Sequence, residues 1–425
     1  MNFADSEVVG SILRGAGHEL ADSMDEADFV LINTCAIRDN AEQRVRHRVR
    51  ELRAAQGRNK SLRIGILGCM AERLQSRLMA EEDNVSFVCG PDAYRRLPAL
   101  LAQVREGQRG TEVELSTTET YADIEPVRLA SNGISAYISI MRGCQNYCSY
   151  CVVPYTRGRE RSRDPQTIVA EARGLFEKGY REVTLLGQNV NSYLHESVGF
   201  PELMDMVASI SPLLRVRFAT SHPKDLSDKL LAVMASHENI CRCIHLPVQS
   251  GSNRMLKAMN RKYTVEWYLD RVESIRRHMP DCSITTDVIA GFCGETLEDH
   301  AATLELFRRV RYDYAYMFKY SQREGTYAAK HMPDDIADEE KTRRLNEIIA
   351  LQGQIALENN RKEVGREYEV LVEGESHRSK EQLFGRNSQN KVLVFDRRDA
   401  VPGTYRKVRV KDCTAATLIG ELTTM

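Results

Sequence analysis

The feature that most constrains the fold of this chain is a regular alternation of short apolar runs with amphipathic, helix-like stretches. Six such apolar runs follow one another at residues 136–141, 182–186, 215–219, 243–246, 284–290 and 314–320. Alternation of this kind is typical of parallel sheets, because each helix carries the chain back to the same edge of the sheet. The pattern predicts a partial (β/α)6 barrel, whose reactive face lies at the carboxyl ends of the strands.

The sequence on either side of this alternation predicts two further domains. Near the N-terminus, apolar runs at 29–33 and 63–67 alternate with helix-like stretches, which indicates a small parallel α/β domain. After a long charged helix at about 337–360, short strand-like runs indicate a small all-β barrel. We expect the following organisation: an α/β domain at 1–105, a linker at 106–133, the barrel core at 134–360 and the β-barrel domain at 361–425.

Composition excludes several classes of protein. Lys and Arg number 59 against 60 Asp and Glu, so the global charge of -1 does not by itself indicate a nucleic-acid partner. No apolar run reaches the roughly eighteen residues of a membrane span, and the first residues carry no signal-peptide pattern. We expect a soluble cytoplasmic protein with no membrane segment. Its 11 Cys residues are then more often buried, reactive or metal-binding than bridged.

Three of these cysteines form the chemically most specific motif of the chain. Cys144, Cys148 and Cys151 lie within eight residues, just past the first predicted strand of the barrel. Thiolates are the ligands that iron–sulfur clusters prefer, and three of them leave one iron of a 4Fe–4S cluster open to a substrate. The alternatives are a zinc site or buried thiols. Structural zinc needs a fourth ligand nearby, and the next twenty-five residues contain neither Cys nor His.

The C-x-x-x-C-x-x-C motif, with Tyr150 before its last Cys, resembles the radical S-adenosylmethionine superfamily. This resemblance implies that the open iron binds S-adenosylmethionine and that reduction yields a 5′-deoxyadenosyl radical. A narrower resemblance, to the methylthiotransferase family, extends over the whole chain and includes a C-terminal TRAM domain at 361–425. It rests on the segments 151–163, 186–193, 220–223, 246–252 and 318–326.

The methylthiotransferase resemblance implies a second, auxiliary 4Fe–4S cluster held by the N-terminal domain. Cys35 and Cys69 occupy two of its three motif positions, each directly after a predicted parallel strand. The family pattern places the third Cys in a Gly-Cys-Gln-Met-Asn segment, which this sequence, beginning Met-Asn, does not contain. A start assigned too late, a trimmed chain, and a cluster that is absent or bound differently are all open explanations. Cys89 is a conceivable substitute, although its apolar strand favours an ordinary buried thiol.

The resemblance also implies a reaction and its partners. The best-fitting branch converts N6-isopentenyladenosine beside the anticodon to its 2-methylthio derivative, with one S-adenosylmethionine donating methyl and a second yielding the radical. The implied partners are the tRNA anticodon stem-loop and an electron donor such as a flavodoxin or ferredoxin, with the enzyme acting as a monomer. The alternatives are methylthiolation of threonylcarbamoyladenosine in tRNA or of a ribosomal-protein aspartate, or a non-catalytic RNA-binding relative.

Polar residues at the predicted strand ends form a second group of candidates. Such residues rarely face a core, so we expect them to bind the cofactor or the target base. They are Gln188, Asn189, Asn191, Ser221, Gln249, Ser250, Asp287 and Gly291. His222 and His245 lie in the same region, where a hydrogen-bonded core histidine is the commoner arrangement.

A cluster of arginines follows the cysteine motif. Arg157, Arg159, Arg161 and Arg163 fall within seven residues. Arginine pairs bidentately with phosphate, so these side chains are candidates for contact with tRNA beside the reaction site. A solvated, charged entry to a helix is the equally open alternative.

Overall fold

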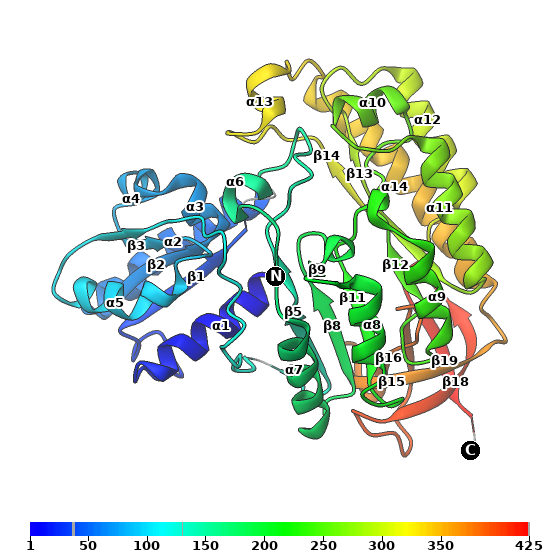
Figure 1. Ribbon diagram of the computed structural model, residues 1–425, viewed down its shortest axis with the longest axis horizontal. Coiled ribbons are helices and arrows are strands. Elements are labelled where there is room, and N and C mark those ends of the chain that lie inside the picture. The colour runs from blue at the N-terminus through cyan, green and yellow to red at the C-terminus, as the bar shows by residue number, and fades with distance from the viewer. Residues whose placement is uncertain (36–38, 130, 424–425) are drawn as a thin grey trace. The chain divides into compact units, whose positions relative to one another are not determined.

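The computed structural model describes residues 1–35, 39–129 and 131–423 (Figure 1). The described chain divides into two compact units, which we treat separately. The first unit combines the N-terminal domain with the cysteine motif, and the second holds the predicted barrel core and the C-terminal domain. The first unit comprises residues 1–129, 141–163 and 323–326, and the second comprises 130–140, 164–322 and 327–425.

The first unit is built on a parallel sheet with the strand order β1-β2-β3-β4. Side chains of β2 alternate between two apolar clusters: Ile64 and Ile66 pack on one face and Leu67 on the other. A strand that is buried on both faces reads as a continuous apolar run, which is why it was recognisable in the sequence. The strands are β1 (Phe29–Thr34), β2 (Arg63–Gly68), β3 (Val85–Cys89) and β4 (Gly110–Glu112). The helices are α1 (Asn2–Gly15), α2 (Asp39–Arg58), α3 (Cys69–Leu74), α4 (Ser76–Glu81) and α5 (Leu97–Arg105), with a short 3-10 turn η1 (Tyr94–Arg96).

The prediction of a linker at 106–133 was wrong for part of this stretch. Strand β4 pairs with β3, and Tyr121 is buried with its ring stacked on Tyr94 at a centroid distance of 5.8 Å. The Tyr121 hydroxyl accepts a hydrogen bond from the Tyr94 backbone N–H (3.1 Å) and donates one to the Pro91 carbonyl (3.0 Å). A three-residue edge strand and one anchoring aromatic ring have no periodic pattern, so the sequence did not reveal that this segment belongs to the first unit.

The cysteine motif also belongs to the first unit, although its sequence position suggested the barrel core. A two-residue antiparallel pairing of β6 (Met141–Arg142) with β7 (Arg161–Ser162) closes the segment. The short helix α6 (Val153–Arg157) lies between the two strands in sequence and packs against α3.

The second unit contains the predicted β/α barrel core. Strands β5, β8 and β11 form one parallel sheet and β12, β13 and β14 another, and a parallel bridge between Val216 and Ile240 lies between them. This arrangement confirms the expected fold class. The strands are β5 (Ser135–Ser139), β8 (Glu182–Leu186), β11 (Arg215–Ala219), β12 (Cys243–His245), β13 (Ser283–Ala290) and β14 (Tyr314–Lys319). The helices are α7 (Pro165–Glu177), α8 (Phe200–Ala208), α9 (Asp228–Ser236), α10 (Asn253–Ala258), α11 (Val265–His278), α12 (Leu297–Val310), α13 (Tyr327–His331) and α14 (Asp338–Arg361).

Local sequence signals set where several of these helices begin. Thr296 and Asp299 form a reciprocal capping box at the start of α12, in which each side chain accepts from the other residue's backbone N–H. Ser227 and Thr264 cap α9 and α11 in the simpler way, by accepting a backbone N–H of the first turn. The helices that follow the strands therefore start at defined residues, and this fixes the loops at the carboxyl ends of the strands.

The C-terminal part of the second unit is a closed antiparallel and parallel barrel with the strand order β15-β16-β17-β19-β18. Its interior is filled by apolar side chains that include Val370, Leu383 and Phe395. The predicted small β-barrel is thus confirmed. Its strands are β15 (Glu367–Ser376), β16 (Ser379–Arg386), β17 (Val392–Asp396), β18 (Tyr405–Cys413) and β19 (Leu418–Leu422).

Buried ion pairs join this barrel to the amino-terminal ends of β8 and β11. Glu182, which is 1% exposed, accepts from Arg217 Nε (2.7 Å) and from Arg386 Nη2 (2.7 Å). Arg217 also donates to the Asn387 carbonyl (2.8 Å) and the Ser388 carbonyl (3.2 Å). The C-terminal barrel therefore covers the edge of the β/α core opposite to the carboxyl ends of its strands.

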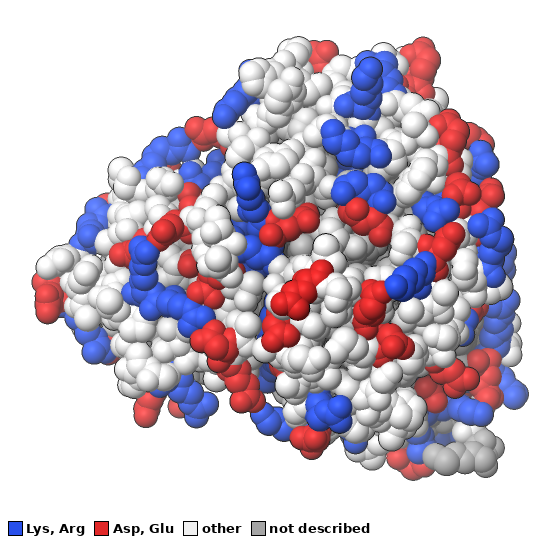
Figure 2. All heavy atoms as spheres, in the orientation of Figure 1, with Lys and Arg blue, Asp and Glu red and all other residues white. Residues whose placement is uncertain are grey.

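No helix in the part of the chain that the structure describes is long and apolar enough to cross a membrane. On the face shown in Figure 2, basic and acidic side chains are interspersed and neither sign covers a large area. The near-equal numbers of the two charge types are thus also mixed locally on this face.

The Glu182 contacts predict a large loss of stability when the carboxylate is removed. Removing one partner of a buried ion pair costs about 3–5 kcal/mol, so Glu182→Gln should lower the thermal unfolding midpoint measured by calorimetry. Glu305→Gln is the matched control, because Glu305 is 71% exposed and its ion pair in the described chain is with Arg308 on its own helix. Its expected effect is below about 0.5 kcal/mol. Equal midpoints for the two variants would contradict the role assigned to Glu182.

The same contacts predict how this difference depends on pH. Burial alone would raise the pKa of Glu182, but Arg217 and Arg386 hold it below its ordinary value. Its contribution to stability is therefore complete above the unfolded-state pKa of about 4.3 and is lost as the pH falls through the lower folded-state pKa. The midpoint difference between the wild type and Glu182→Gln should be largest at neutral pH and should shrink below about pH 4.3.

Candidate functional site

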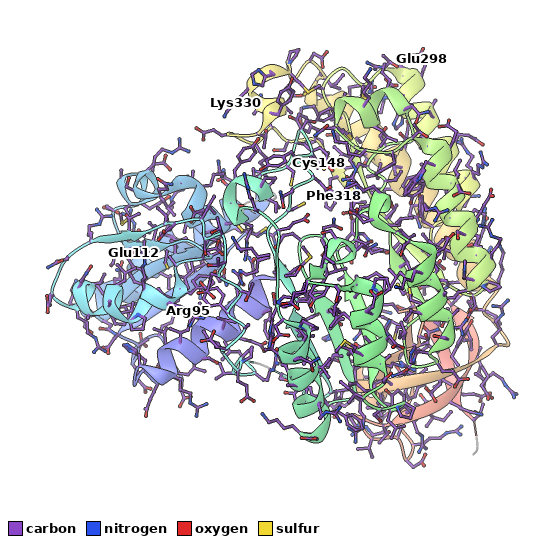
Figure 3. The ribbon with its side chains drawn as sticks, viewed as in Figure 1. Arg95, Glu112, Cys148, Glu298, Phe318 and Lys330 are labelled. Carbon is purple, nitrogen blue, oxygen red and sulfur yellow. The ribbon has the colours of Figure 1, made fainter. Side chains whose placement is uncertain are left out.

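The cysteine motif forms a tight loop between β6 and α6 in the first unit; Cys148 is labelled in Figure 3. The Cys144 N–H donates to the Gly158 carbonyl (3.2 Å), and the Cys151 N–H donates to the Cys148 carbonyl (2.9 Å). Gly143 has a φ of +80°, and a Cβ at this position would lie 1.9 Å from the carbonyl oxygen of Arg159. Only glycine fits here, so the loop is held closely against residues 158 and 159.

The three thiols of the loop lie in a partly buried environment. Cys148 is buried, and Cys144 and Cys151 are half-buried. Burial raises the pKa of the Cys144 thiol to about 11, and hydrogen bonds from the Asn146 backbone and side chain oppose this shift. The Asn146 amide lies 3.4 Å from Cys144 Sγ. Iron binding requires the thiolate, so the loop already supplies a donor to one of the sulfurs that would carry negative charge.

Three thiols on one closed loop match the three protein ligands of a 4Fe–4S cluster that leaves one iron open. Across residues 1–35, 39–129 and 131–423, no group of three or more His, Cys, Asp or Glu side chains is arranged to hold one metal ion.

The strand-end cysteines of the first unit lie on neighbouring parallel strands. Thr34 and Gly68 are register partners in β1 and β2, so Cys35 and Cys69, the next residues of each strand, leave the sheet side by side. The Thr34 hydroxyl donates to the Leu67 carbonyl (2.6 Å) and accepts from the Met70 N–H (3.3 Å), which ties the two strand ends together. The sequence predicted that these two thiols lie at the same edge of the sheet, and the register of β1 and β2 agrees with this prediction.

Cys89 has the environment of an ordinary buried thiol. It is fully buried at the end of β3, and its thiol donates to the Gly90 carbonyl with an S···O distance of 3.6 Å. Burial raises the pKa of Cys89 well above the ordinary value for a thiol. These features agree with the interpretation of Cys89 as a packing residue.

The structure corrects the prediction that the arginines after the motif contact RNA. Arg157 is 2% exposed and pairs with Asp5 (2.6 Å), and Arg161 is 5% exposed and pairs with Asp92 (3.0 Å). A guanidinium buried against a carboxylate is not available to a phosphate, so the prediction was wrong for these two. Arg163 is also buried. Arg159 is exposed, and it keeps its place as a candidate phosphate ligand.

The carboxylates that pair with these arginines were missed at the sequence level. Asp5 is buried on α1 among apolar residues that include Val8 and Val9, and it also accepts from Arg142 Nη1 (3.0 Å). Burial alone would raise the pKa of Asp5, but Arg157 and Arg142 hold it below its usual range. A charged residue on the buried face of an amphipathic helix is a signal that could have identified Asp5. Asp92, in the turn after β3, carried no comparable signal.

In the second unit, polar atoms without partners gather after β8 and β11. Asn189 is 1% exposed, and its Oδ1 has no hydrogen-bond partner among the described residues; the same holds for both side-chain polar atoms of Asn191. His222 Nε2, after β11, is also buried and unpartnered in the described chain. Buried polar atoms are nearly always satisfied, so several orphans at adjacent strand ends mark a place where a polar ligand fits.

His222 meets the expectation of a hydrogen-bonded core histidine at only one of its two ring nitrogens in the described chain. Its Nδ1 accepts from the Lys224 N–H (3.3 Å), and burial, aided by Arg261 and Lys224, lowers its pKa to about 2. The neutral ring therefore carries its hydrogen on Nε2, which is the unpartnered atom. His245, by contrast, is satisfied by Thr285 Oγ1 (2.9 Å) and lies 3.4 Å from Asp287.

Backbone strain is found at the same ends of the strands. Thr220 has a φ of +71° and Gln249 a φ of +73°, and neither is a glycine. Left-handed conformations cost energy, most of all for a β-branched residue such as Thr, and they cluster at functional sites. The Val190 N–H donates to the Thr220 carbonyl (2.9 Å), which joins the loops after β8 and β11.

The remaining candidates for cofactor binding lie at the strand ends, but they differ in whether they already have hydrogen-bond partners within the protein. The backbone of Gln249 is held by Asp287 and Ile289 of β13, so Gln249 and Asp287 lie together. The Ser221 hydroxyl donates to the His245 carbonyl, and Ser250 faces Thr303 of α12 (3.4 Å). Gly291 donates its N–H to Glu295 (2.8 Å). Protein partners are thus already present for Ser221, Ser250 and Gly291. Unpartnered atoms among the described residues are found instead on Asn189 and Asn191. Gln188 lies in the same loop, directly after Gly187.

Three family models match successive parts of the chain. The family model described as the radical SAM superfamily matches residues 138–307. The uncharacterized protein family UPF0004 matches residues 1–90, and the TRAM domain matches residues 361–423.

Solved structures resemble the fold at low sequence identity. A radical S-adenosylmethionine methyltransferase, TsrM, from Kitasatospora setae, solved with cobalamin and a [4Fe-4S] cluster, matches with a TM-score of 0.59 at 13% identity. The match covers 76% of this chain and 73% of that one. The cobalamin-dependent S-adenosylmethionine radical enzyme OxsB matches with a TM-score of 0.55 at 12% identity, over 82% of this chain and 53% of that one. At this identity the likeness supports the fold alone.

Curated relatives are much more similar and extend over nearly the whole chain. A protein of Phocaeicola vulgatus named tRNA-2-methylthio-N(6)-dimethylallyladenosine synthase is 55% identical over 426 residues, which are 99% of this chain and 93% of the relative. Proteins of the same name from Amoebophilus asiaticus (55% identical, 100% and 90% covered) and Porphyromonas gingivalis (52% identical, 99% and 92% covered) agree. The resemblance inferred from the motifs is therefore confirmed, and the chain belongs to the radical S-adenosylmethionine family of tRNA-2-methylthio-N(6)-dimethylallyladenosine synthases.

Proposed function

We propose that this chain converts N6-isopentenyladenosine beside the anticodon of tRNA to its 2-methylthio derivative, using S-adenosylmethionine and two 4Fe–4S clusters. The observation that carries the proposal is that two separate sets of thiols belong to one compact unit. The cysteine loop and the strand-end cysteines are joined there, because Val152, next to Cys151, packs directly on Cys69. A reaction that needs one cluster to make a radical and another to supply sulfur requires two such sets.

The residues of this chain divide the work between binding and positioning. Cys144, Cys148 and Cys151 would hold the first cluster, and Cys35 and Cys69 would contribute to the second. When bound, the clusters and S-adenosylmethionine supply an electron, a carbon-centred radical, a sulfur atom and a methyl group. A radical is needed because an aromatic C–H bond is inert to acid–base chemistry, and the protein's part is to position these groups and exclude water.

The carboxyl ends of β8 and β11 supply the groups that would hold S-adenosylmethionine. Its ribose hydroxyls, amino group and carboxylate need both donors and acceptors. Neutral His222 offers an N–H donor at Nε2, Asn189 offers an acceptor, and Asn191 offers both. Because each of these atoms is buried without a partner in the described chain, ligand binding would satisfy them without first breaking protein contacts.

The remaining partners are proposed from the reaction. Reduction of a cluster requires an electron donor such as a flavodoxin or ferredoxin, and the substrate places the enzyme in the cytoplasm, where we expect it to act as a monomer. Exposed Arg159, next to the cysteine loop, and the C-terminal β-barrel are the candidate RNA contacts.

The reaction is tested by the nucleosides of bulk tRNA. In a strain that lacks its own enzyme of this family, expression of this protein should convert N6-isopentenyladenosine to the 2-methylthio form, measured by liquid chromatography and mass spectrometry. A strain that expresses Cys144→Ala should accumulate the unmodified nucleoside. A methylthio group found on threonylcarbamoyladenosine, or on a ribosomal protein and not on isopentenyladenosine, would refute the proposed substrate.

The two sets of thiols predict two different defects. Cys148→Ala should abolish both the release of 5′-deoxyadenosine and product formation, because the first cluster loses a ligand. Cys69→Ala should lower the iron content of the anaerobically reconstituted protein by about four per chain and stop product formation, while 5′-deoxyadenosine is still released. Cys413→Ala is the control, since Cys413 lies on β18 of the C-terminal barrel; it should change neither readout. Loss of 5′-deoxyadenosine release in Cys69→Ala would count against a separate second site.

The exposure of Arg159 predicts a modest, salt-dependent contribution to tRNA binding. Loss of one phosphate contact should reduce the slope of log affinity against log salt by about 0.7–0.9 in Arg159→Gln. Arg308→Gln, a change of an equally basic, 55% exposed side chain on α12, is the matched control and should leave the slope unaltered. Filter binding of tRNA over a salt series measures both variants. Identical slopes for Arg159→Gln and wild type would remove Arg159 from the interface.

A further inference from the structure

Arg157 is fully enclosed between a carboxylate and a thiol that the resemblance to methylthiotransferases assigns to the auxiliary cluster. Its Nη2 lies 2.6 Å from Asp5 Oδ2, and its Nε–H donates to Cys69 Sγ with an N···S distance of 3.0 Å. The side chain is 2% exposed. The third nitrogen, Nη1, is buried and makes no hydrogen bond to any described residue.

The charges around Arg157 do not balance within the described protein. Three buried guanidinium groups, of Arg142, Arg157 and Arg161, face two buried carboxylates, of Asp5 and Asp92, in the part of the first unit that the structure describes. Three guanidinium charges against two carboxylates leave an excess of one, and the amino group of Met1, which also interacts with Asp5 and Arg157, is a further basic group here. Burying an unpaired charge is costly, so a stable fold needs an anion here.

Among the described residues, no further carboxylate pairs with these three arginines. Of the other buried acids, Glu7 pairs with Arg128 and Glu42 with Arg73, and Glu72 forms no ion pair with the three arginines in the described chain. Asp5 forms ion pairs with both Arg142 and Arg157. Arg142 alone would neutralise its charge, so Arg157 is not needed for that purpose. The remaining neighbour of Arg157 is the sulfur of Cys69, and a thiolate bound to iron carries the negative charge that is otherwise missing.

We propose that Arg157 is a positioning residue of the auxiliary cluster, which holds Cys69 Sγ through Nε and stabilises the reduced cluster with its buried positive charge. The inference rests on the proposed function, because it requires Cys69 to be a ligand of the second cluster. Reduction potentials of iron–sulfur clusters are set by net charge, hydrogen bonds to sulfur and solvent exposure. Arg157 acts on the first two, and Nη1 is available for one more hydrogen bond to the cluster.

The position of Arg157 in the chain also connects the two sets of thiols. Arg157 is the last residue of α6, and the carbonyl of the next residue, Gly158, accepts the Cys144 N–H that closes the cysteine loop. The residue that holds the auxiliary sulfur is therefore covalently adjacent to an anchor of the first loop. A test must separate an effect on the auxiliary cluster from damage to that loop.

The test is a redox titration of the auxiliary cluster alone. Cys144→Ala, Cys148→Ala and Cys151→Ala together remove the first cluster, and the reconstituted full chain is then titrated by electron paramagnetic resonance. Addition of Arg157→Gln should shift the reduction equilibrium at least tenfold against reduction, which is about 59 mV for one electron. Arg157→Lys, which keeps the charge but not the planar fork, should shift it less.

Arg161→Gln is the matched control in the same background. It also removes a buried guanidinium from the cluster of charges, but in the described chain Arg161 pairs with Asp92 and donates to the Arg157 carbonyl, not to Cys69. Its shift should be much smaller than that of Arg157→Gln. A potential unchanged by Arg157→Gln, or an equal shift in both variants, would overturn the proposal.

A folding defect is kept apart from the redox effect by a double variant. Arg157→Gln combined with Asp5→Asn removes both charges of the pair, and it should show the same shift relative to Asp5→Asn alone.

The outcome also distinguishes this proposal from the proposed function. If the chain without the three loop cysteines binds no iron, the two-cluster function itself is wrong, and the role of Arg157 falls with it. If that chain binds about four irons but its potential does not respond to Arg157, only the present proposal fails.

Discussion

The first unit depends on a buried carboxylate, Asp5, which is shared by two guanidinium groups. Asp5 comes from α1, Arg142 from β6 and Arg157 from the end of α6, so one ion group fastens the N-terminal helix to both sides of the cysteine loop. Loss of one partner of such a group costs about 3–5 kcal/mol, a large fraction of the stability of a domain. This explains why residues 141–163 fold with the N-terminal domain, although the sequence pattern assigns them to the barrel core.

An analogous ion group sets the geometry of the second unit. Glu182, at the first residue of β8, is bound by Arg217 of β11 and by Arg386 of β16, so the C-terminal barrel is attached to the amino-terminal edge of the core. In both units a carboxylate shared by two arginines joins segments that are distant in the sequence. The bidentate guanidinium is suited to this role, since it can bind a carboxylate and backbone carbonyls at once.

The architecture and the thiols were predictable, because they leave local marks in the sequence. The apolar runs at 182–186 and 215–219 are short, flanked by polar turns and alternate with helices, and they became β8 and β11 with the expected bounds. The cysteine loop was recognisable because three thiols in eight residues are improbable without a ligand. Burial of Arg157 and Arg161 was not predictable. Their partners, Asp5 and Asp92, lie more than sixty residues away in the chain, and a basic run has the same sequence whether it faces water or a buried carboxylate.

The contrast between the two edges of the second unit explains where its chemistry can occur. At the amino-terminal edge, the buried charged groups of Glu182 and Arg217 are hydrogen-bonded to other parts of the protein, so they need no ligand. At the carboxyl edge, Asn189 and His222 carry buried polar atoms with no partner among the described residues, and the backbone is strained at Thr220. Folding alone does not favour such features, because each of them costs free energy. These features persist because the packed strands and the hydrogen-bonded amino-terminal edge hold the backbone in place. A polar ligand that binds at the carboxyl edge would recover part of their free-energy cost.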